Sequence, residues 1–65
     1  MARKPGPANL GTIVSVRGSV VAARFDAHLP PVYTMLVTGP DKTIFIEVLA
    51  QLDAQHVRGI DLLHG

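Results

Sequence analysis

The chain has 65 residues and no cysteine, so it forms one domain at most and contains neither disulfides nor thiolate metal sites. Hydrophobic residues make up 48% of it, which is rich for so small a soluble domain and indicates a contact surface for partner subunits. Six basic and five acidic residues are scattered along the chain, without the basic stripe expected of a nucleic-acid binder. No apolar run approaches the ~20 residues of a membrane-spanning helix, so we expect no direct membrane insertion.

Residues 1–9 contain Pro5, Gly6 and Pro7, which sustain neither a helix nor a central strand, so they are predicted to form a flexible N-terminal arm. Residues 10–65 are predicted to form one β-barrel domain, because β-branched residues recur with a period of two. The predicted strands cover residues 12–16, 19–25, 32–38, 43–50 and 57–63.

Two glycines indicate special backbone geometry. Gly18 separates the first two strands and suits a tight turn, a bend or a bulge, because glycine adopts backbone angles closed to other residues. Gly59 lies inside the fifth predicted strand and indicates a bulge or a close backbone approach. Residues 51–56 fit either a short helical turn or an irregular crossing.

Strict alternation assigns the strand residues to two faces. It places Thr12, Val14 and Val16 together on one face of the first strand. On the fourth strand, it places Val48 and Glu47 on opposite faces. Five strands with turn signals at this spacing predict an all-β fold, a small Greek-key-like barrel of five to six strands.

The sequence shows no catalytic or metal-binding constellation. The histidines at positions 28, 56 and 64 are far apart and lack the spacing that aims two imidazoles at one metal. Lys42 and Thr43 are not preceded by the glycines of a phosphate-binding loop, and no serine lies in a nucleophile elbow. We therefore expect the chain itself to be no enzyme and to hold no catalytic residue, metal or cofactor.

Four charged residues are candidate interface residues. Glu47 is the acidic residue in the middle of a predicted strand. Its carboxylate is expected to point into an interface, or at an arginine such as Arg17, Arg24 or Arg58, or simply toward solvent between apolar neighbours. An exposed ion pair would stabilise the fold by no more than ~1 kcal/mol, so any larger role would come from an interface.

A family resemblance covers nearly everything from residue 10 to residue 62. The segment 11–21 (GTIVSVRGSVV), then Glu47-Val48, Gln51-Leu52 and Val57-Arg58, resembles in order the opening of the beta subunit of the rotary ATP synthase. The alpha subunit and the vacuolar-type homologues begin with similar barrels and are the nearest alternatives.

The resemblance implies an N-terminal six-stranded barrel that forms a crown with the barrels of alternating alpha and beta subunits. It implies a peripheral complex on the cytoplasmic side of a bacterial inner membrane, in which the full-length parent couples ATP synthesis or hydrolysis to proton or sodium flow. ATP and magnesium would bind the nucleotide-binding domain that follows in the family, and no residue of this chain matches that domain's motifs.

Two departures from the family pattern affect the expectations. Ala22 stands where the family usually has an acidic residue, so any polar contact made there is missing. The family barrel also continues into a final strand, so we expect a barrel that is incomplete at its C-terminal edge. An open edge exposes unpaired N–H and C=O groups, and the piece is expected either to pair edge to edge as an oligomer or to close poorly.

Two other classes of function remain open at this point. A free-standing OB-like or SH3-like barrel could bind nucleic acid, but it would need a basic groove lined with aromatic residues, which the sequence does not supply. A small enzyme is the least favoured reading, because no acid/base pair is present.

Overall fold

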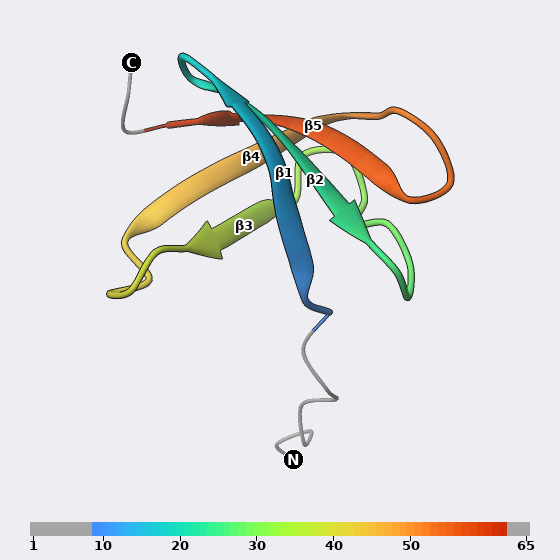
Figure 1. Cartoon of the computed structure of the whole chain (residues 1–65), viewed down its shortest axis with the longest axis horizontal. Helices are drawn as coiled ribbons and strands as arrows, with labels where there is room; N and C mark the ends of the chain where they lie inside the picture. The colour runs from blue at the N-terminus through green and yellow to red at the C-terminus, as the bar shows by residue number, and fades with distance from the viewer. Residues whose placement is uncertain (1–8, 63–65) are drawn as a thin grey trace.

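The computed structural model describes residues 9–62, which form a single antiparallel sheet (Figure 1). The strands follow the order β1-β2-β5-β4-β3 across the sheet. Because β3, β4 and β5 are joined as consecutive hairpins and β5 then pairs with β2, the arrangement is a Greek key. The all-β prediction is confirmed. The strands are β1 (Gly11–Arg17), β2 (Val20–Phe25), β3 (Met35–Thr38), β4 (Ile44–Gln51) and β5 (His56–Asp61).

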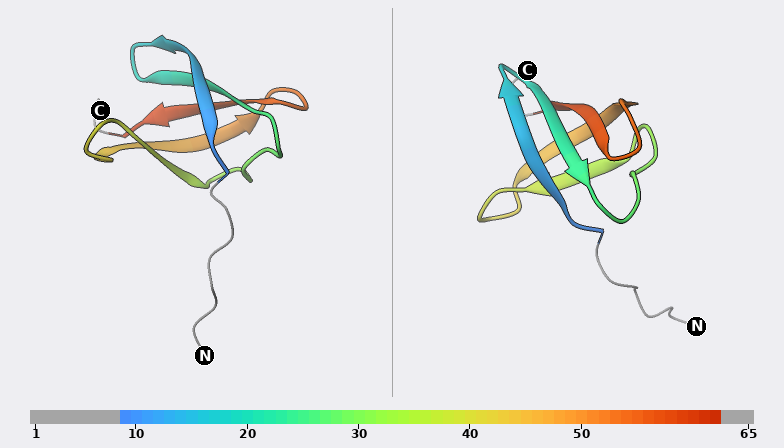
Figure 2. Two further views of the ribbon diagram at one scale, coloured as in Figure 1. Left: turned by 60° about the horizontal axis from the view of Figure 1, so that its bottom comes forward. Right: turned by 45° about the vertical axis from the view of Figure 1, so that its right-hand side comes forward.

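The sheet curls into a half-barrel, as the two rotated views show (Figure 2). Its edge strands, β1 and β3, do not pair with each other, so the barrel is incomplete as expected, but its open edges are not at the C-terminal strand as predicted. The last described strand, β5, lies in the middle of the sheet between β2 and β4. The gap in the barrel therefore lies between β1 and β3.

The core fills the concave, inner face of the sheet. Val48 and Val57 are fully buried, with 0% and 1% of their surface exposed, and Leu29 and Leu36 pack against the buried cluster. Alternation along β2, and along β4 as far as Val48, is visible in the burial pattern and confirms the faces predicted there. The register then shifts between Val48 and Ala50, so Ala50 lies opposite the outward-facing Arg58, and its predicted place on the face of Val48 is wrong. The buried apolar residues are Val21, Ala23, Phe25, Ile46, Val48 and Val57.

One face assignment on β1 is wrong. Ile13 lies opposite Ala23 and Val16 lies opposite Val21, both of which are buried on the inner face. The register shifts between Ile13 and Ser15, so an extra residue enters the strand and reverses the alternation that follows. Val16 therefore shares a face with Ile13 rather than with Thr12.

The third strand is shorter than predicted, since β3 begins at Met35 and not at residue 32. Tyr33 has a φ of 73°, outside the extended region, and the N–H of Thr34 donates to the carbonyl of Pro31 in a turn. The N–H of Tyr33 still reaches the carbonyl of Val48 at 2.7 Å, which ties this turn to β4.

The tight turn considered at Gly18 is confirmed. Gly18 has a φ of +59° in the hairpin between β1 and β2. The N–H of Lys42 donates to the carbonyl of Gly39 in the hairpin between β3 and β4. Residues 52–55 form an irregular turn rather than a helical one, and residue 63, the predicted end of the fifth strand, lies outside the described residues.

Candidate functional site

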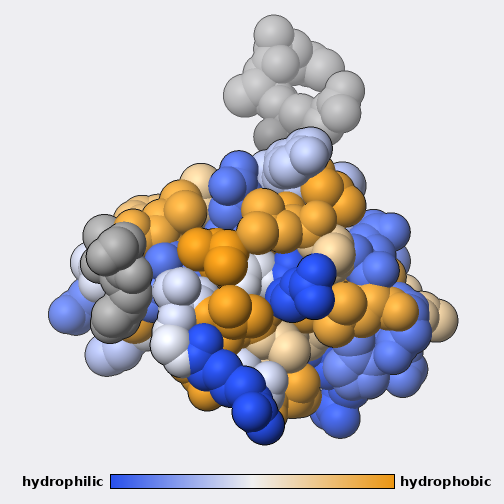
Figure 3. Space-filling view, turned by 90° about the horizontal axis from the view of Figure 1, so that it is seen from above, coloured by the Kyte–Doolittle hydropathy of each residue, from blue (hydrophilic) through white to orange (hydrophobic). Residues whose placement is uncertain are grey.

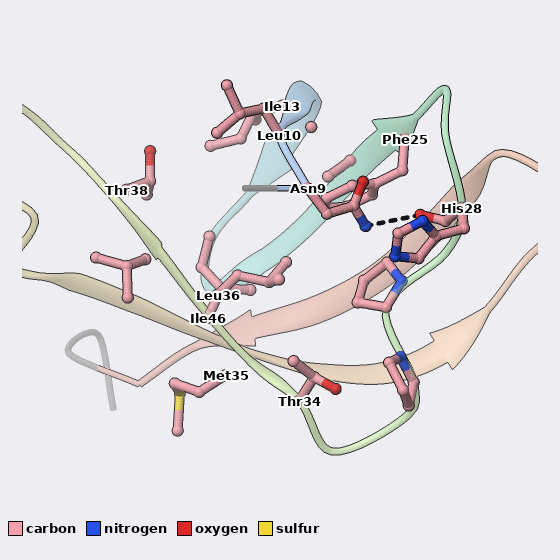
Figure 4. A pocket seen from close by; sticks show the side chains of 15 residues that line it. Asn9, Leu10, Ile13, Phe25, His28, Thr34, Met35, Leu36, Thr38 and Ile46 are labelled. Carbon is pink, nitrogen blue, oxygen red and sulfur yellow. Dashed lines mark hydrogen bonds between the residues drawn. The ribbon is translucent and has the colours of Figure 1, made fainter. Parts of the chain in front are cut away.

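A groove of about 450 Å³ opens on the inner face, in the gap between β1 and β3 (Figure 4). Its walls are mostly apolar: Ile13 from β1, Phe25 from β2 and Leu36 from β3 all contribute to it. No Lys or Arg of the described chain lines the groove, so it does not resemble the basic channel that binds nucleic acid.

Asn9 contributes polar atoms at one end of this groove. Its Nδ2 donates a hydrogen bond of 2.9 Å to the backbone carbonyl of His28 (Figure 4). Its Oδ1 is buried and has no hydrogen-bond partner among the described residues. A buried acceptor without a donor is costly, so a group that brings an N–H here would be stabilised.

The two edges that border the groove run in the same direction. Each neighbouring pair in the sheet is antiparallel, and four such steps lead from β1 to β3. All seven residues of β1 are exposed. One added strand can therefore lie antiparallel to both edges and satisfy the unpaired backbone groups of each.

The second candidate surface is the convex side of the sheet, which we term the outer face. Cross-strand pairing aligns Val20, Ile60, Glu47 and Met35 in one row over β2, β5, β4 and β3. The adjoining pair on β3 and β4 is Val37 and Phe45. Apart from the half-buried Ile60 and Glu47, these side chains are 39–51% exposed, although all except Glu47 are apolar.

The four predicted interface residues do not form one cluster. Arg24 lies 3.3 Å from Asp26, and both side chains are well exposed, so this ion pair stabilises the fold only weakly. Arg17 lies at the end of β1, opposite Val20. Glu47 and Arg58 lie on neighbouring strands of the outer face, and neither makes an ion pair with any residue in the described part of the chain.

The sequence reading missed a carboxylate-centred turn between β4 and β5. Asp53 accepts hydrogen bonds from the backbone N–H groups of Gln55 and His56 at 2.8 and 2.9 Å, and His56 Nδ1 lies 2.8 Å from the same oxygen. The hydrogen bond from Gln55, followed by that from the His56 side chain, holds the pKa of Asp53 below its ordinary value of 3.8. Aspartate favours such turns because its side chain accepts a hydrogen bond from the backbone N–H two residues later, so Asp53 between two predicted strands is the signal in the sequence.

Within residues 9–62, no group of three or more His, Asp or Glu side chains could hold a metal ion. His28 lies in the loop after β2 and His56 is the first residue of β5, and residue 64 is outside the described part of the chain. The same residues contain no helix that could cross a membrane. The groove offers apolar side chains beside open backbone groups, and the outer face carries Arg17, Glu47 and Arg58 without an ion pair among the described residues.

The half-barrel, with its apolar groove and its partly apolar outer face, defines a small, incomplete β-barrel domain. Its sequence is 56% identical over 52 residues to ATP synthase subunit beta 2 of Chlorobium luteolum, with 80% of this chain covered. It is 59% identical over 54 residues to subunit beta 2 of Polaromonas naphthalenivorans, and 55% identical over 62 residues to that of Albidiferax ferrireducens, with 83% and 95% of the chain covered. The chain is therefore a relative of the ATP synthase beta subunits, as the resemblance indicated.

The match covers 11–12% of the length of these relatives, so the chain spans about a tenth of the subunit. A piece of this size with an incomplete barrel is consistent with the N-terminal domain of the family. No family model matches the chain, and no solved structure matches it.

Proposed function

We propose that the chain serves as the crown domain of an ATP synthase beta subunit and that its task is assembly. The observation that carries the proposal is the identity of 55–59% over four-fifths or more of the chain to beta subunits of three bacteria. The exposed apolar residues of the outer face support it, because surfaces of this kind mark protein–protein contacts.

The partners in this proposal are the barrels of neighbouring alpha and beta subunits. Arg17, Arg24, Glu47 and Arg58 all lie at or near the outer rows of the sheet, where they would surround an apolar contact with charged groups. The full-length parent would couple ATP synthesis or hydrolysis to proton or sodium flow, from the cytoplasmic side of a bacterial membrane. ATP and magnesium would bind the parent's nucleotide-binding domain and not this chain.

The open edges of the sheet offer a further route to association. We propose that the isolated chain adds a strand edge of another copy to β1 or β3, because both edges present unpaired backbone groups. Each copy has two such edges, so this route leads to assemblies larger than dimers.

A chimera tests the assembly role. Residues 10–62 replace the matching segment in the beta subunit of Polaromonas naphthalenivorans, and native mass spectrometry follows its assembly with that organism's alpha subunit. We expect the chimera to assemble like the parent subunit. A chimera whose barrel folds, as judged by circular dichroism, but which stays outside the complex would contradict the proposal. A control chimera with Val48→Asp, which disrupts the core, shows that assembly depends on a folded barrel.

A further inference from the structure

The outer face carries an apolar surface that no described part of the chain covers. Val20 and Met35, at the two ends of the central row, have 40% and 46% of their surface exposed, and Val37 has 51%. The row crosses four adjacent strands, so these side chains lie side by side rather than scattered. A space-filling view of one side of the molecule shows hydrophobic surface around strongly hydrophilic side chains (Figure 3).

A carboxylate lies inside this apolar row. Glu47 is opposite Ile60 on β5 and opposite Met35 on β3, and Phe45 precedes it by two residues on the same face. Its side chain is half-buried, and it makes no ion pair with the residues that the structure describes. A charge at such a position opposes burial of the row unless the partner supplies a cation.

The same face also holds cations: Arg17 lies at the β1 end of the row, and Arg58 lies near Glu47. Arg58 precedes Ile60 by two residues on β5 and lies opposite Ala22 on β2, so its side chain leaves the sheet on the side of Glu47. It is exposed, and within residues 9–62 it has no acidic partner. Glu47 and Arg58 are thus diagonal neighbours across two strands, each without a counter-ion.

We propose that the outer face binds the outer face of a second copy, in a two-fold symmetric dimer in which Glu47 of each copy pairs with Arg58 of the other. A two-fold axis between the two positions makes both ion pairs at once, since a contact of one residue with another implies the reverse contact. The two convex faces would meet where β4 and β5 carry Glu47 and Arg58, and not over their whole width as in a β-sandwich. The middle of the apolar row would then be buried between them and the charges neutralised.

Charge complementarity selects a second copy as the occupant. A partner for this face must present a cation to Glu47 and an anion to Arg58 at the same spacing, and the outer face itself presents that pair. A guanidinium also suits the task, because it donates two parallel hydrogen bonds to one carboxylate. The dimer requires only this chain, and it would compete with the subunit contact proposed above, because both use the outer face.

The test measures the mass of the 65-residue chain by sedimentation equilibrium over a wide range of concentrations. We expect a monomer–dimer equilibrium for the parent chain in dilute solution, with larger species from edge pairing only at the highest concentrations. Glu47→Arg and Arg58→Glu should each weaken dimerisation at least about tenfold, because like charges would meet across the axis. The double variant restores opposite charges and should recover most of the loss. Circular dichroism of each variant confirms that it is folded.

Asp41→Arg is the matched control. It changes the charge by the same amount as Glu47→Arg, but in the exposed hairpin between β3 and β4, and should leave the dimer unchanged. A parent chain that stays monomeric at all concentrations would overturn the proposal. A dimer whose affinity is unchanged in both Glu47→Arg and Arg58→Glu would also overturn it. In that case, loss of the dimer in Val14→Lys would assign the contact to the β1 edge instead.

Discussion

Gly59 lies so close to the backbone of Glu47 that it has no room for a side chain. A Cβ at Gly59 would come 2.6 Å from the carbonyl oxygen of Glu47 and 2.7 Å from the Ile46 side chain. The oxygen belongs to the backbone of β4 and cannot move without distorting the β4–β5 pairing. Of the bulge or close approach predicted at this glycine, the close approach is confirmed, and the irregularity nearby lies on β4, between Val48 and Ala50.

We expect Gly59→Ala to lower the free energy of unfolding by about 1–3 kcal/mol, because the added methyl group forces a backbone shift. Urea denaturation followed by circular dichroism measures the loss. Gly18→Asn is the matched control: nothing lies within 4 Å of a Cβ there, and asparagine tolerates its positive φ. Equal losses for the two variants would contradict the steric explanation.

Val48 should be the most sensitive apolar position. Its side chain is fully buried in the cluster with Val57 and Phe25, so Val48→Ala leaves a cavity and should cost about 2–3 kcal/mol. Val16→Ala, at a position with 59% of its surface exposed, should change stability by less than about 0.5 kcal/mol. Thermal unfolding of both variants provides the measurement, and similar melting temperatures would show that the core is placed wrongly.

The Asp53 turn should make stability depend on pH in acid solution. The pKa of Asp53 is lower in the folded chain than its ordinary value of 3.8, so the native state binds fewer protons than the unfolded chain. Its contribution is therefore fully present above pH 3.8 and is lost as the pH falls from there through the folded pKa. The side chain of Asp53→Asn cannot titrate, so the stability that this variant lacks relative to the parent should shrink as the pH falls through this range. The midpoint of urea denaturation, measured at each pH, gives the difference. A deficit that is constant with pH would refute the account.

The open edge should drive association beyond the dimer. We expect Val14→Lys, which places a charge on β1, to reduce the light scattering of concentrated solutions, because a lysine on an edge strand opposes strand addition. Val14 is already 47% exposed, so the fold should tolerate the change. Thr43→Lys, which adds the same charge at an exposed position outside the strands, is the control. Equal scattering from the parent and both variants would argue against edge pairing.

A nucleotide-binding measurement tests the proposal that ATP binds the parent's nucleotide-binding domain and not this chain. We expect isothermal titration of the chain with magnesium-ATP to give no saturable heat, since the groove offers no cation to phosphate groups. The full-length beta subunit of a relative is the positive control. Saturable binding by the chain alone would contradict the assignment of ATP to the parent's other domain.

The pattern of apolar residues was enough to predict the class of fold and the five strands. Burial alternates with period two along β2 and along the first part of β4, and it follows the alternation of residue types in the sequence. The register shift in β1 could not be predicted, because it depends on how Ile13 and Ser15 meet β2 and not on their own propensities. The same holds for Tyr33, a good strand former that takes a turn conformation after two prolines.

The candidate site was predictable in part. Glu47 and Arg58 stood out as charges within apolar strands, yet their place on one face follows only from the pairing of β4 with β5. The pairing of Arg24 with Asp26 removed one candidate partner for Glu47. The groove depends on which strands become edges, and the strand order β1-β2-β5-β4-β3 is a property of the whole sheet.

The common direction of β1 and β3 has a consequence for what can seal the barrel. In an antiparallel sheet with an odd number of strands, the two edge strands run in the same direction. The number of strands added in the gap therefore decides whether both edges can be paired in antiparallel fashion. A lone strand satisfies each side, whereas a hairpin would have to run parallel to one of them. Any polypeptide that completes this cylinder with antiparallel ladders throughout must therefore cross the gap an odd number of times.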